Sequence, residues 1–235
     1  MRWTALSDSI SENQLVMPLT LAVDTTSEYG SLALLRDGDL LEEALLHAPD
    51  SFSPVLYDEL RRLLERHALK LADIDCFAAA SGPGTFTGVR VALACVKGLA
   101  EAMGRPAVAV SNLQAVARYG QAPLRAAVLD ARRGEVYAAV YDASGNLVMP
   151  EVVAKLAPWL ESLPAGVEEF LSNDLPLDLA GTRFEAARIV TAPRALGAAI
   201  ARIAADRLAC GEAGDAASLD ANYVRRTDAE LALKV

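Results

Sequence analysis

Residues 19–46 have the sequence LTLAVDTTSEYGSLALLRDGDLLEEALL, in which three short apolar runs are separated by turn residues. The first run ends at Asp24, and the turn signal Asp37-Gly38-Asp39 separates the second run from the third. An Asp-Gly pair between apolar runs is typical of a β-hairpin. The segment therefore predicts a β-meander of three strands.

Residues 125–153, with the sequence RAAVLDARRGEVYAAVYDASGNLVMPEVV, repeat this plan. An apolar run again ends at an aspartate, Asp130, and the alternating run VYAAVY leads to the turn Ser144-Gly145-Asn146. Any two meanders share some of these features. We nevertheless interpret the pair as a duplication, because turn, strand and aspartate keep the same order in both halves.

Helix and strand signals follow each meander. After the first, residues 53–67 carry a stripe of leucines that predicts an amphipathic helix, with Ser53 as the N-cap and Pro54 at the first helical position. A buried strand (74–81) and a helix (about 89–103) should follow. After the second meander we expect a short helix (156–163), strands at LDLAG (177–181) and ARIV (187–190), and a long helix (193–210). This pattern predicts a duplicated α/β architecture.

In such folds ligands bind beyond the carboxyl ends of the strands, where Asp24 and Asp130 would face each other. The segment SGPGTFTGVR (81–90) also joins a predicted strand to a predicted helix, where backbone N–H groups can hold an anion. Its glycine spacing matches neither the dinucleotide fingerprint nor a Walker A loop. Two interpretations stay open: a Pro-Gly turn with Thr85 or Thr87 as helix cap, or a phosphate or nucleotide site formed by Asp24, Thr25, Thr26, Gly82, Gly84, Thr85 and Asp130.

The helix after the glycine segment carries Arg90, Lys97 and Glu101 as its charged residues. A helix that is apolar nearly all round is either buried or covered by another chain. We expect a partner contact, with core packing as the alternative. With the leucine stripe of the helix at 53–67, the predicted partner interface comprises Leu56, Leu60, Leu63, Val89, Arg90, Leu93, Val96, Lys97, Leu99 and Ala100.

Composition narrows the function classes. The chain has 235 residues and a formal net charge of −9. So acidic a chain repels phosphate backbones, and it lacks the basic stripe of independent nucleic-acid binders. Three widely spaced cysteines without a CxxC pair favour a reducing cytoplasm. The sequence has no HExxH or HxxxH pair for a metal site on one helix, and no apolar run of membrane-spanning length. Residues 1–17 are predicted to be a flexible tail, with Met17 as a candidate start.

Several segments resemble the bacterial TsaB (YeaZ) family. They are LAVDTTSEYGSLAL, SGPGTFTGVRVALACVKGLAEAMGRPAVAVSNLQAVA, DARRGEVYAAVYDASG and, near the end, ANYVRR. The glycine segment (81–90) is highly specific to this family, and the resemblance runs from about Leu19 to Arg226. Relatives often have a His-Ser pair at the start of the first helix. This chain has SFSPVL there, with His47 several residues earlier, so the surface of that helix is expected to differ in detail.

The resemblance implies a duplicated actin-like (ASKHA, ribonuclease H-like) fold of two β-meander-plus-helix subdomains, spanning 18–108 and 109–226, with a C-terminal tail at 227–235. It implies a non-catalytic role in forming N6-threonylcarbamoyladenosine at position 37 of tRNAs that read ANN codons. The implied partners are a TsaD-like transferase and a TsaE-like ATPase, with a homodimer when the transferase is absent and tRNA contacted indirectly. The chain would hold no metal or cofactor of its own, although ATP or ADP could bind at a partner interface.

Two other functions compete with this one. An active small-molecule kinase or ATPase of the same superfamily would use Asp24 and Asp130 to organise magnesium and phosphates, but few convergent polar residues remain to bind adenosine and an acceptor. A metallopeptidase, a label that the family sometimes carries, lacks its metal ligands in this sequence. The helper subunit is therefore the preferred interpretation.

Overall fold

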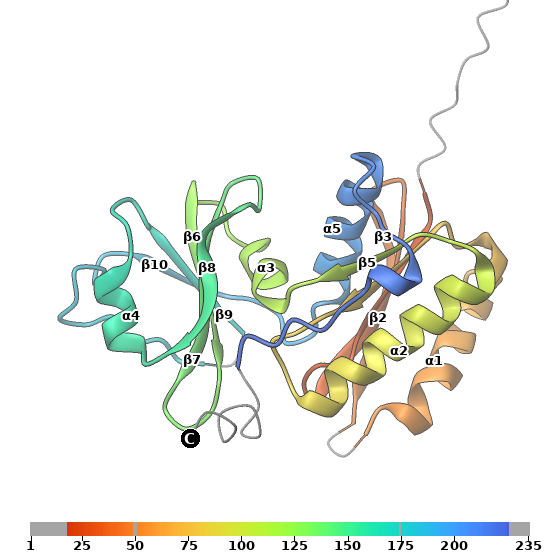
Figure 1. The fold of residues 1–235 in the computed structure, drawn as a ribbon, viewed down its shortest axis with the longest axis horizontal. Coiled ribbons are helices and arrows are strands. Elements are labelled where there is room, and N and C mark those ends of the chain that lie inside the picture. The colour runs from red at the N-terminus through yellow and green to blue at the C-terminus, as the bar shows by residue number, and fades with distance from the viewer. Residues whose placement is uncertain (1–17, 49–50, 174, 226–235) are drawn as a thin grey trace, which may run out of the picture.

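The computed structural model describes residues 18–48, 51–173 and 175–225. The predicted tails at 1–17 and 227–235, and Met17, lie outside the described residues. Figure 1 shows two lobes side by side, each built around one β-sheet, with helices on the outer faces and between the lobes. In the described part of the chain, no helix has the length and apolar character needed to cross a membrane.

The first lobe contains a sheet with strand order β3-β2-β1-β4-β5. β1 pairs antiparallel with β2 and parallel with β4, and β4 pairs parallel with β5. The central strand β1 is buried at every position, as expected for a strand covered on both faces. The strand bounds are β1 Thr20–Asp24, β2 Tyr29–Arg36, β3 Asp39–His47, β4 Cys76–Ala80 and β5 Ala107–Val110.

The second lobe repeats the topology of the first. Its strand order is β10-β9-β6-β7-β8, with β6 antiparallel to β7 and parallel to β9. Counted from the start of each lobe, the strands therefore follow one plan, and Asp24 and Asp130 each end the first strand. The duplication predicted from the two meanders is confirmed. The bounds are β6 Leu124–Asp130, β7 Val136–Asp142, β8 Leu147–Ala154, β9 Glu169–Ser172 and β10 Arg188–Thr191.

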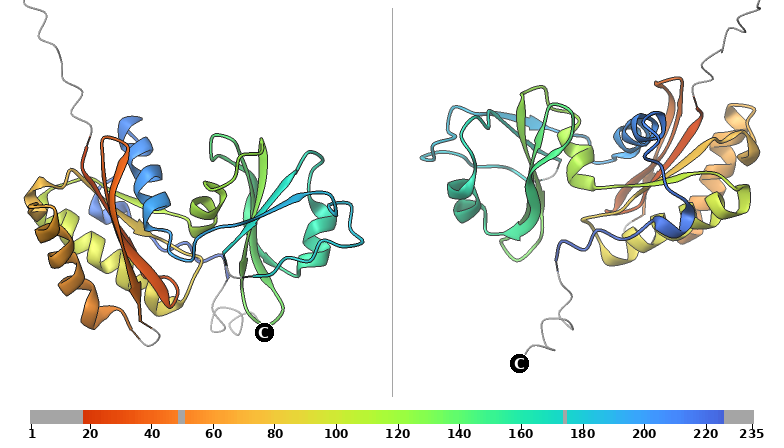
Figure 2. Two further views of the ribbon diagram at one scale, coloured as in Figure 1. Left: turned by 180° about the vertical axis from the view of Figure 1, so that it is seen from behind. Right: turned by 45° about the horizontal axis from the view of Figure 1, so that its top comes forward.

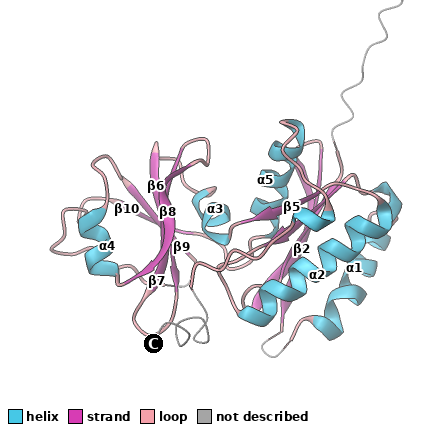
Figure 3. Ribbon diagram, viewed as in Figure 1, coloured by secondary structure: helices cyan, strands magenta, loops and turns pink. Residues whose placement is uncertain are grey.

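The helices are distributed over both faces of the sheets (Figure 3). α1 and α2 pack on one face of the first sheet, and α4 covers the outer face of the second. α3 and α5 lie between the two sheets, as both views in Figure 2 show. The helix bounds are α1 Ser53–Arg66, α2 Phe86–Met103, α3 Asn112–Ala117, α4 Leu156–Ser162 and α5 Gly197–Ala209, with short 3-10 turns at Leu71–Asp73 and Ala216–Ser218.

The two lobes exchange helices across their boundary. α5 follows the second sheet in sequence but packs against β1, β2 and β4 of the first, whereas α3 packs against β6 and β7 of the second. Alanines at Ala22, Ala33 and Ala78 form the surface of the first sheet beneath α5, and their small side chains allow the helix to approach closely. One continuous apolar core therefore runs from the first sheet through α5 and α3 to the second.

Local predictions were wrong in two places, and one strand was missed. Ser53 is the first residue of α1 and not its N-cap, which is Phe52 with no side-chain hydrogen bond, because Pro54 is accommodated one position further into the helix. The LDLAG segment is irregular and not a strand. The strand of that region is β9, at Glu169–Ser172, where the polar ends of the four-residue run hid it from the apolar pattern.

Candidate functional site

The site begins at Asp24, where β1 ends. The carboxylate is 1% exposed, and both of its oxygens accept hydrogen bonds. Oδ1 accepts from the Thr26 amide at 3.0 Å and from the Thr26 hydroxyl at 2.6 Å, and Oδ2 accepts from the Leu196 amide at 3.2 Å. Leu196 is the N-cap of α5, so this carboxylate joins the turn after β1 to the helix supplied by the second half of the chain.

Burial raises the pKa of Asp24 above its ordinary value of 3.8, against the lowering effect of the hydrogen bonds from Thr26 and Leu196. The folded protein therefore holds this proton at pH values where the unfolded chain has lost it. The contribution of Asp24 to stability should be greatest below pH 3.8 and should fall as the pH rises toward the raised pKa.

The direction of this pH dependence of stability can be tested with Asp24→Asn, which cannot ionise. Denaturant unfolding of both proteins between pH 3.5 and 8 should show that the stability of the original chain, relative to the variant, falls with rising pH. A relative stability that rises with pH would mean that the hydrogen bonds outweigh burial and that the carboxylate is held as an anion.

The glycine segment packs closely against the backbone of the turn at residues 25–26. The Thr85 amide donates to the Thr26 carbonyl at 2.7 Å, and the Thr25 hydroxyl donates to the Gly88 carbonyl at 2.7 Å. A Cβ on Gly84 would lie 2.6 Å from the Thr26 carbonyl oxygen, and one on Gly88 would overlap the Thr25 carbonyl oxygen. The glycines are therefore required by the close approach of the turn at 25–26, and Thr85 caps α2 by accepting from the Gly88 amide, as one of the two interpretations predicted.

A side chain that the sequence analysis did not single out completes this network. The Asn112 amide donates to the Thr26 hydroxyl at 2.5 Å, and its oxygen accepts from the Gly82 amide at 3.0 Å. Asn112 is buried and opens α3, directly after β5. Its signal in the sequence is a polar pair, Ser111-Asn112, at the end of a buried strand.

The cleft between the lobes has a volume of about 500 Å³. It is lined from the first lobe by Thr26, Gly84 and Thr85 and from the second by Asp130 and Arg132, among others. The structure thus brings four of the predicted phosphate-site residues to one cleft (Thr26, Gly84, Thr85 and Asp130). It leaves Asp24, Thr25 and Gly82 buried beneath the surface.

Asp130 differs from its counterpart Asp24. It is exposed, accepts from the Arg132 amide at 2.8 Å, and has a loose ion pair of 3.5 Å with the Arg132 guanidinium. The two aspartates therefore occupy equivalent positions in different environments, one inside the core and one at the mouth of the cleft. Among the described residues, no group of three or more His, Cys, Asp and Glu side chains is placed to hold a metal ion.

The α1–α2 layer forms the second candidate site, and here one expectation is corrected. The apolar stripe does not need another chain to cover it, because it packs on the lobe's own sheet beside Leu21, Leu34 and Phe77. Seven of the predicted interface residues are core residues of the monomer: Leu56, Leu60, Leu63, Val89, Leu93, Val96 and Ala100. Arg90 is exposed, and Lys97 and Leu99 are partly exposed.

The outward face of this layer consists of other residues. On α2 it runs through Thr87, Val91, Ala94 and Gly98, of which Val91 is partly exposed and the others are exposed. On α1 it includes the exposed Val55 and Tyr57, and the Tyr57 hydroxyl lies beside the Cys95 thiol of α2. We call these six residues the helix face. It is uncharged at its centre, and its middle is formed by the small residues Ala94 and Gly98.

Comparison with known proteins gives concordant matches. The family model described as TsaD, tRNA N6-adenosine threonylcarbamoyltransferase, matches residues 47–210. A Bacillus subtilis protein named tRNA threonylcarbamoyladenosine biosynthesis protein TsaB is 33% identical over 61% of this chain, and the Escherichia coli protein of the same name is 35% identical over 54%. These matches span 65% and 56% of the two relatives, less than two thirds of either.

A solved structure extends the likeness to the whole fold. The structure of YeaZ from Pseudomonas aeruginosa has a TM-score of 0.71 and 29% sequence identity, and the superposition covers 88% of this chain and all of that one. The prediction of a duplicated actin-like fold is confirmed by this likeness together with the repeated sheet topology.

Proposed function

The chain belongs to the TsaB (YeaZ) family, and from this premise we propose that it is a non-catalytic subunit of the complex that forms N6-threonylcarbamoyladenosine at position 37 of tRNAs reading ANN codons. In this role it binds and supports a TsaD-like transferase. A TsaE-like ATPase is the further partner that we propose, with a homodimer when the transferase is absent. Any ATP or ADP would bind at a partner interface.

The observation that carries this proposal is that backbone amides of the glycine segment already donate hydrogen bonds to other groups of the same chain. In a phosphate-binding loop, backbone amides point at the ligand. Here the amides of Gly82, Thr85 and Gly88 donate to the chain's own Asn112, Thr26 and Thr85. The carboxylate that would organise a metal at the end of β1 is buried and hydrogen-bonded to its neighbours. The groups that a kinase would use are thus engaged in hydrogen bonds within the chain itself.

The helix face supports the choice of partner. The transferase family model matches residues 47–210, which include α1 and α2, so a transferase of that family has counterparts of both helices. Two related chains can therefore pair through equivalent surfaces around an approximate two-fold axis, as homodimers do. Ala94 and Gly98 would let a partner helix approach closely at the centre. A specific interface of this kind buries about 1,600 Å² in total.

Reconstituted tRNA modification with and without this chain tests the proposal. With a cognate TsaD-like transferase, a TsaE-like ATPase and a supply of threonylcarbamoyl-adenylate, omitting the chain should lower the rate by about tenfold or more, the scale of a strong coupling between sites. Adding Asp130→Ala protein in its place should restore the rate, because Asp130 has no chemical role in a helper.

Two outcomes would contradict the proposal. One is modification that proceeds at the same rate without the chain. The other is ATP hydrolysis by the isolated chain that Asp130→Ala abolishes, which would favour the kinase or ATPase alternative at the interlobe cleft.

A further inference from the structure

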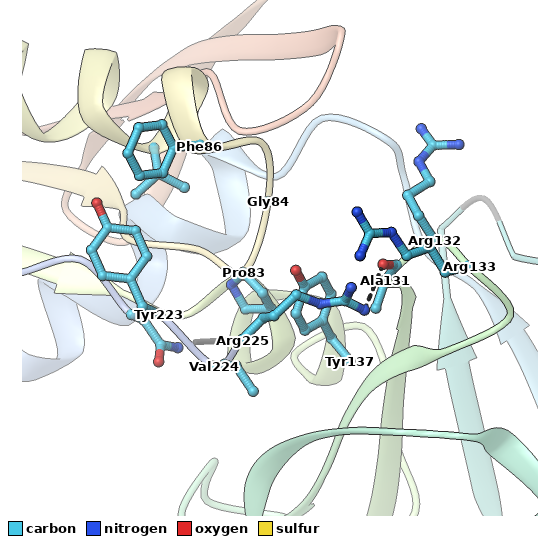
Figure 4. Close-up of a pocket in the computed structure, with 12 residues that line it drawn as sticks. Pro83, Gly84, Phe86, Ala131, Arg132, Arg133, Tyr137, Tyr223, Val224 and Arg225 are labelled. Carbon is cyan, nitrogen blue, oxygen red and sulfur yellow. Dashed lines mark hydrogen bonds between the residues drawn. The ribbon is translucent and has the colours of Figure 1, made fainter. Parts of the chain in front are cut away.

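A cluster of arginines lines a second cavity at the mouth of the cleft, although the chain as a whole is strongly acidic. The cavity has a volume of about 450 Å³ and lies between the glycine segment, the β6–β7 hairpin and residues 222–225, which we call the C-terminal segment. Arg132, Arg133 and Arg225 line it, and the described lining residues include no carboxylate (Figure 4). The Arg132 side chain is 87% exposed. We call this cavity the arginine pocket.

Exposed aromatic rings stand on the opposite side of the arginine pocket. Phe86, at the start of α2, is 50% exposed, and Tyr223, in the C-terminal segment, is 47% exposed. Their rings are nearly parallel, at 29°, with centroids 6.1 Å apart. The Arg90 guanidinium lies 3.6 Å above the centre of the Phe86 ring and donates to the Tyr223 hydroxyl at 3.2 Å, so one cation holds both rings in place.

Arg225 fixes the geometry between these two sides. Its Nη2 donates to the Ala131 carbonyl at 3.0 Å and pairs with the Glu135 carboxylate at 2.6 Å, so the C-terminal segment is attached to the hairpin. Its Nε is buried and has no hydrogen-bond partner among the described residues. The arginine pocket is thus assembled from three parts of the chain and retains an unused donor in its wall.

The hairpin itself is built from residues that suit its backbone poorly. Arg132 and Arg133 have φ angles of 61° and 58°, in the left-handed region that glycine and asparagine adopt with less strain. The Glu135 amide donates to the Arg132 carbonyl, which closes a turn with Arg133 and Gly134 at its centre. Arginine at these two positions therefore costs stability relative to glycine or asparagine.

We propose that the arginine pocket binds one nucleotide of a single-stranded RNA segment, with its phosphate at Arg132 and Arg133 and its base against the rings of Phe86 and Tyr223. Guanidinium groups that hold the backbone and aromatic faces that stack on bases are the two components of single-strand recognition. An acidic peptide would use the arginines and leave the rings without a role. The choice of RNA rests on the proposed function, which concerns tRNA.

The acidity of the rest of the chain limits how strongly the arginine pocket can bind RNA. A net charge of −9 repels a polyanion, so a single pocket gives weak, salt-sensitive binding by the isolated chain. Its value would lie in positioning RNA that a larger assembly already holds. The test must therefore measure binding at low salt, with the full chain, and must use variants that keep the fold.

The decisive variant is Arg132→Asn combined with Arg133→Asn. It removes two charges and creates the Asn-Gly pair that turns of this kind prefer, so thermal stability should be unchanged or higher. Fluorescence anisotropy with a labelled anticodon stem-loop of an ANN-reading tRNA should show affinity lower by about tenfold or more, and a salt slope reduced by about 0.7, the value for one single-strand phosphate that is no longer neutralised. Phe86→Ala should weaken binding by about tenfold through lost stacking.

The matched control is Arg61→Gln combined with Arg62→Gln, which removes the same charge from the exposed surface of α1. It should keep the original affinity and salt slope. Equal losses in the two double variants would reduce the effect to net charge and overturn the proposal. So would unchanged binding in the hairpin variant, or displacement of the labelled RNA by ATP or poly-glutamate at the concentrations at which unlabelled RNA displaces it.

Because no transferase is present, this assay fails or succeeds independently of the proposed function. RNA binding that the hairpin variant leaves unchanged, in a chain that still supports the transferase, would overturn the arginine pocket alone. RNA binding through the arginine pocket by a chain that modification does not require would remove the helper role instead.

Discussion

Replacing Gly88 by alanine is expected to destabilise the folded chain by about 3 kcal/mol, at the upper end of the cost of forcing an extra methyl group into a packed site. The new Cβ would overlap the Thr25 carbonyl oxygen, which is backbone and cannot rotate away. It would also lie 2.6 Å from the Thr85 hydroxyl that caps α2. Chemical denaturation monitored by circular dichroism measures the change directly.

The same substitution elsewhere on the same helix provides the control. Gly98 has no atom within 4 Å of the position that a Cβ would take. Gly98→Ala should therefore stabilise the chain by roughly 0.5–1 kcal/mol, the difference in helix propensity between the two residues. Opposite signs for the two variants would support a structural role for the glycine segment. A Gly88→Ala protein of unchanged stability would instead indicate that Gly88 leaves room for a ligand.

Local sequence signals were sufficient for most of the fold. The Asp-Gly turn at 37–38 and the aspartates that end β1 and β6 predicted both meanders and their duplication, because hairpin chemistry and strand alternation act over a few residues. The signals failed where the pattern was short or mixed. β9 has glutamate and serine at its ends, and its buried Glu169 accepts backbone hydrogen bonds from Gln121 and Ala122, a compensation that sequence does not display.

The exchange of helices across the lobes could not be predicted from the residues. α5 has the composition of a buried helix, and nothing local distinguishes packing on the first sheet from packing on the second. What decides it is a set of long-range contacts: the Asp24 carboxylate at the Leu196 amide, and the Ser31 hydroxyl at the Gly197 amide at 3.0 Å. These bonds connect positions that are far apart in the chain.

Only part of the candidate site could be predicted, again because local patterns do not show which elements pack together. Apolar spacing correctly marked one side of α2 as covered, but periodicity cannot tell whether the cover is a sheet of the same chain or a second molecule. Leu93 and Val96 therefore proved to be core residues, and the face available to a partner is defined by Ala94 and Gly98, which carry almost no pattern signal. The positive φ angles of Arg132 and Arg133 were likewise hidden by the absence of glycine or asparagine at those positions.

The second large effect is expected at the helix face. Ala94→Arg places a guanidinium in the centre of the proposed interface, where an uncompensated buried charge costs about 3 kcal/mol or more. Affinity for the transferase should therefore fall by about 100-fold or more. Gly98→Arg should act in the same way while raising helix propensity, so its loss of binding cannot be attributed to a weakened fold.

The control for surface charge lies on the other lobe. Ala157 of α4 is exposed and far from the helix face, and Ala157→Arg adds the same side chain to the same kind of position. We expect this protein to bind the transferase as the original chain does. Circular dichroism melts of all three variants should stay within a few degrees of the original, because each position is exposed on a helix.

The most direct measurement is a calorimetric titration of the cognate TsaD-like transferase with the original chain, Ala94→Arg, Gly98→Arg and Ala157→Arg. The account predicts tight binding by the first and last proteins and loss of about 100-fold or more in affinity for the two helix-face variants. Equal affinity in all four would contradict it, since the transferase would then bind another surface or none.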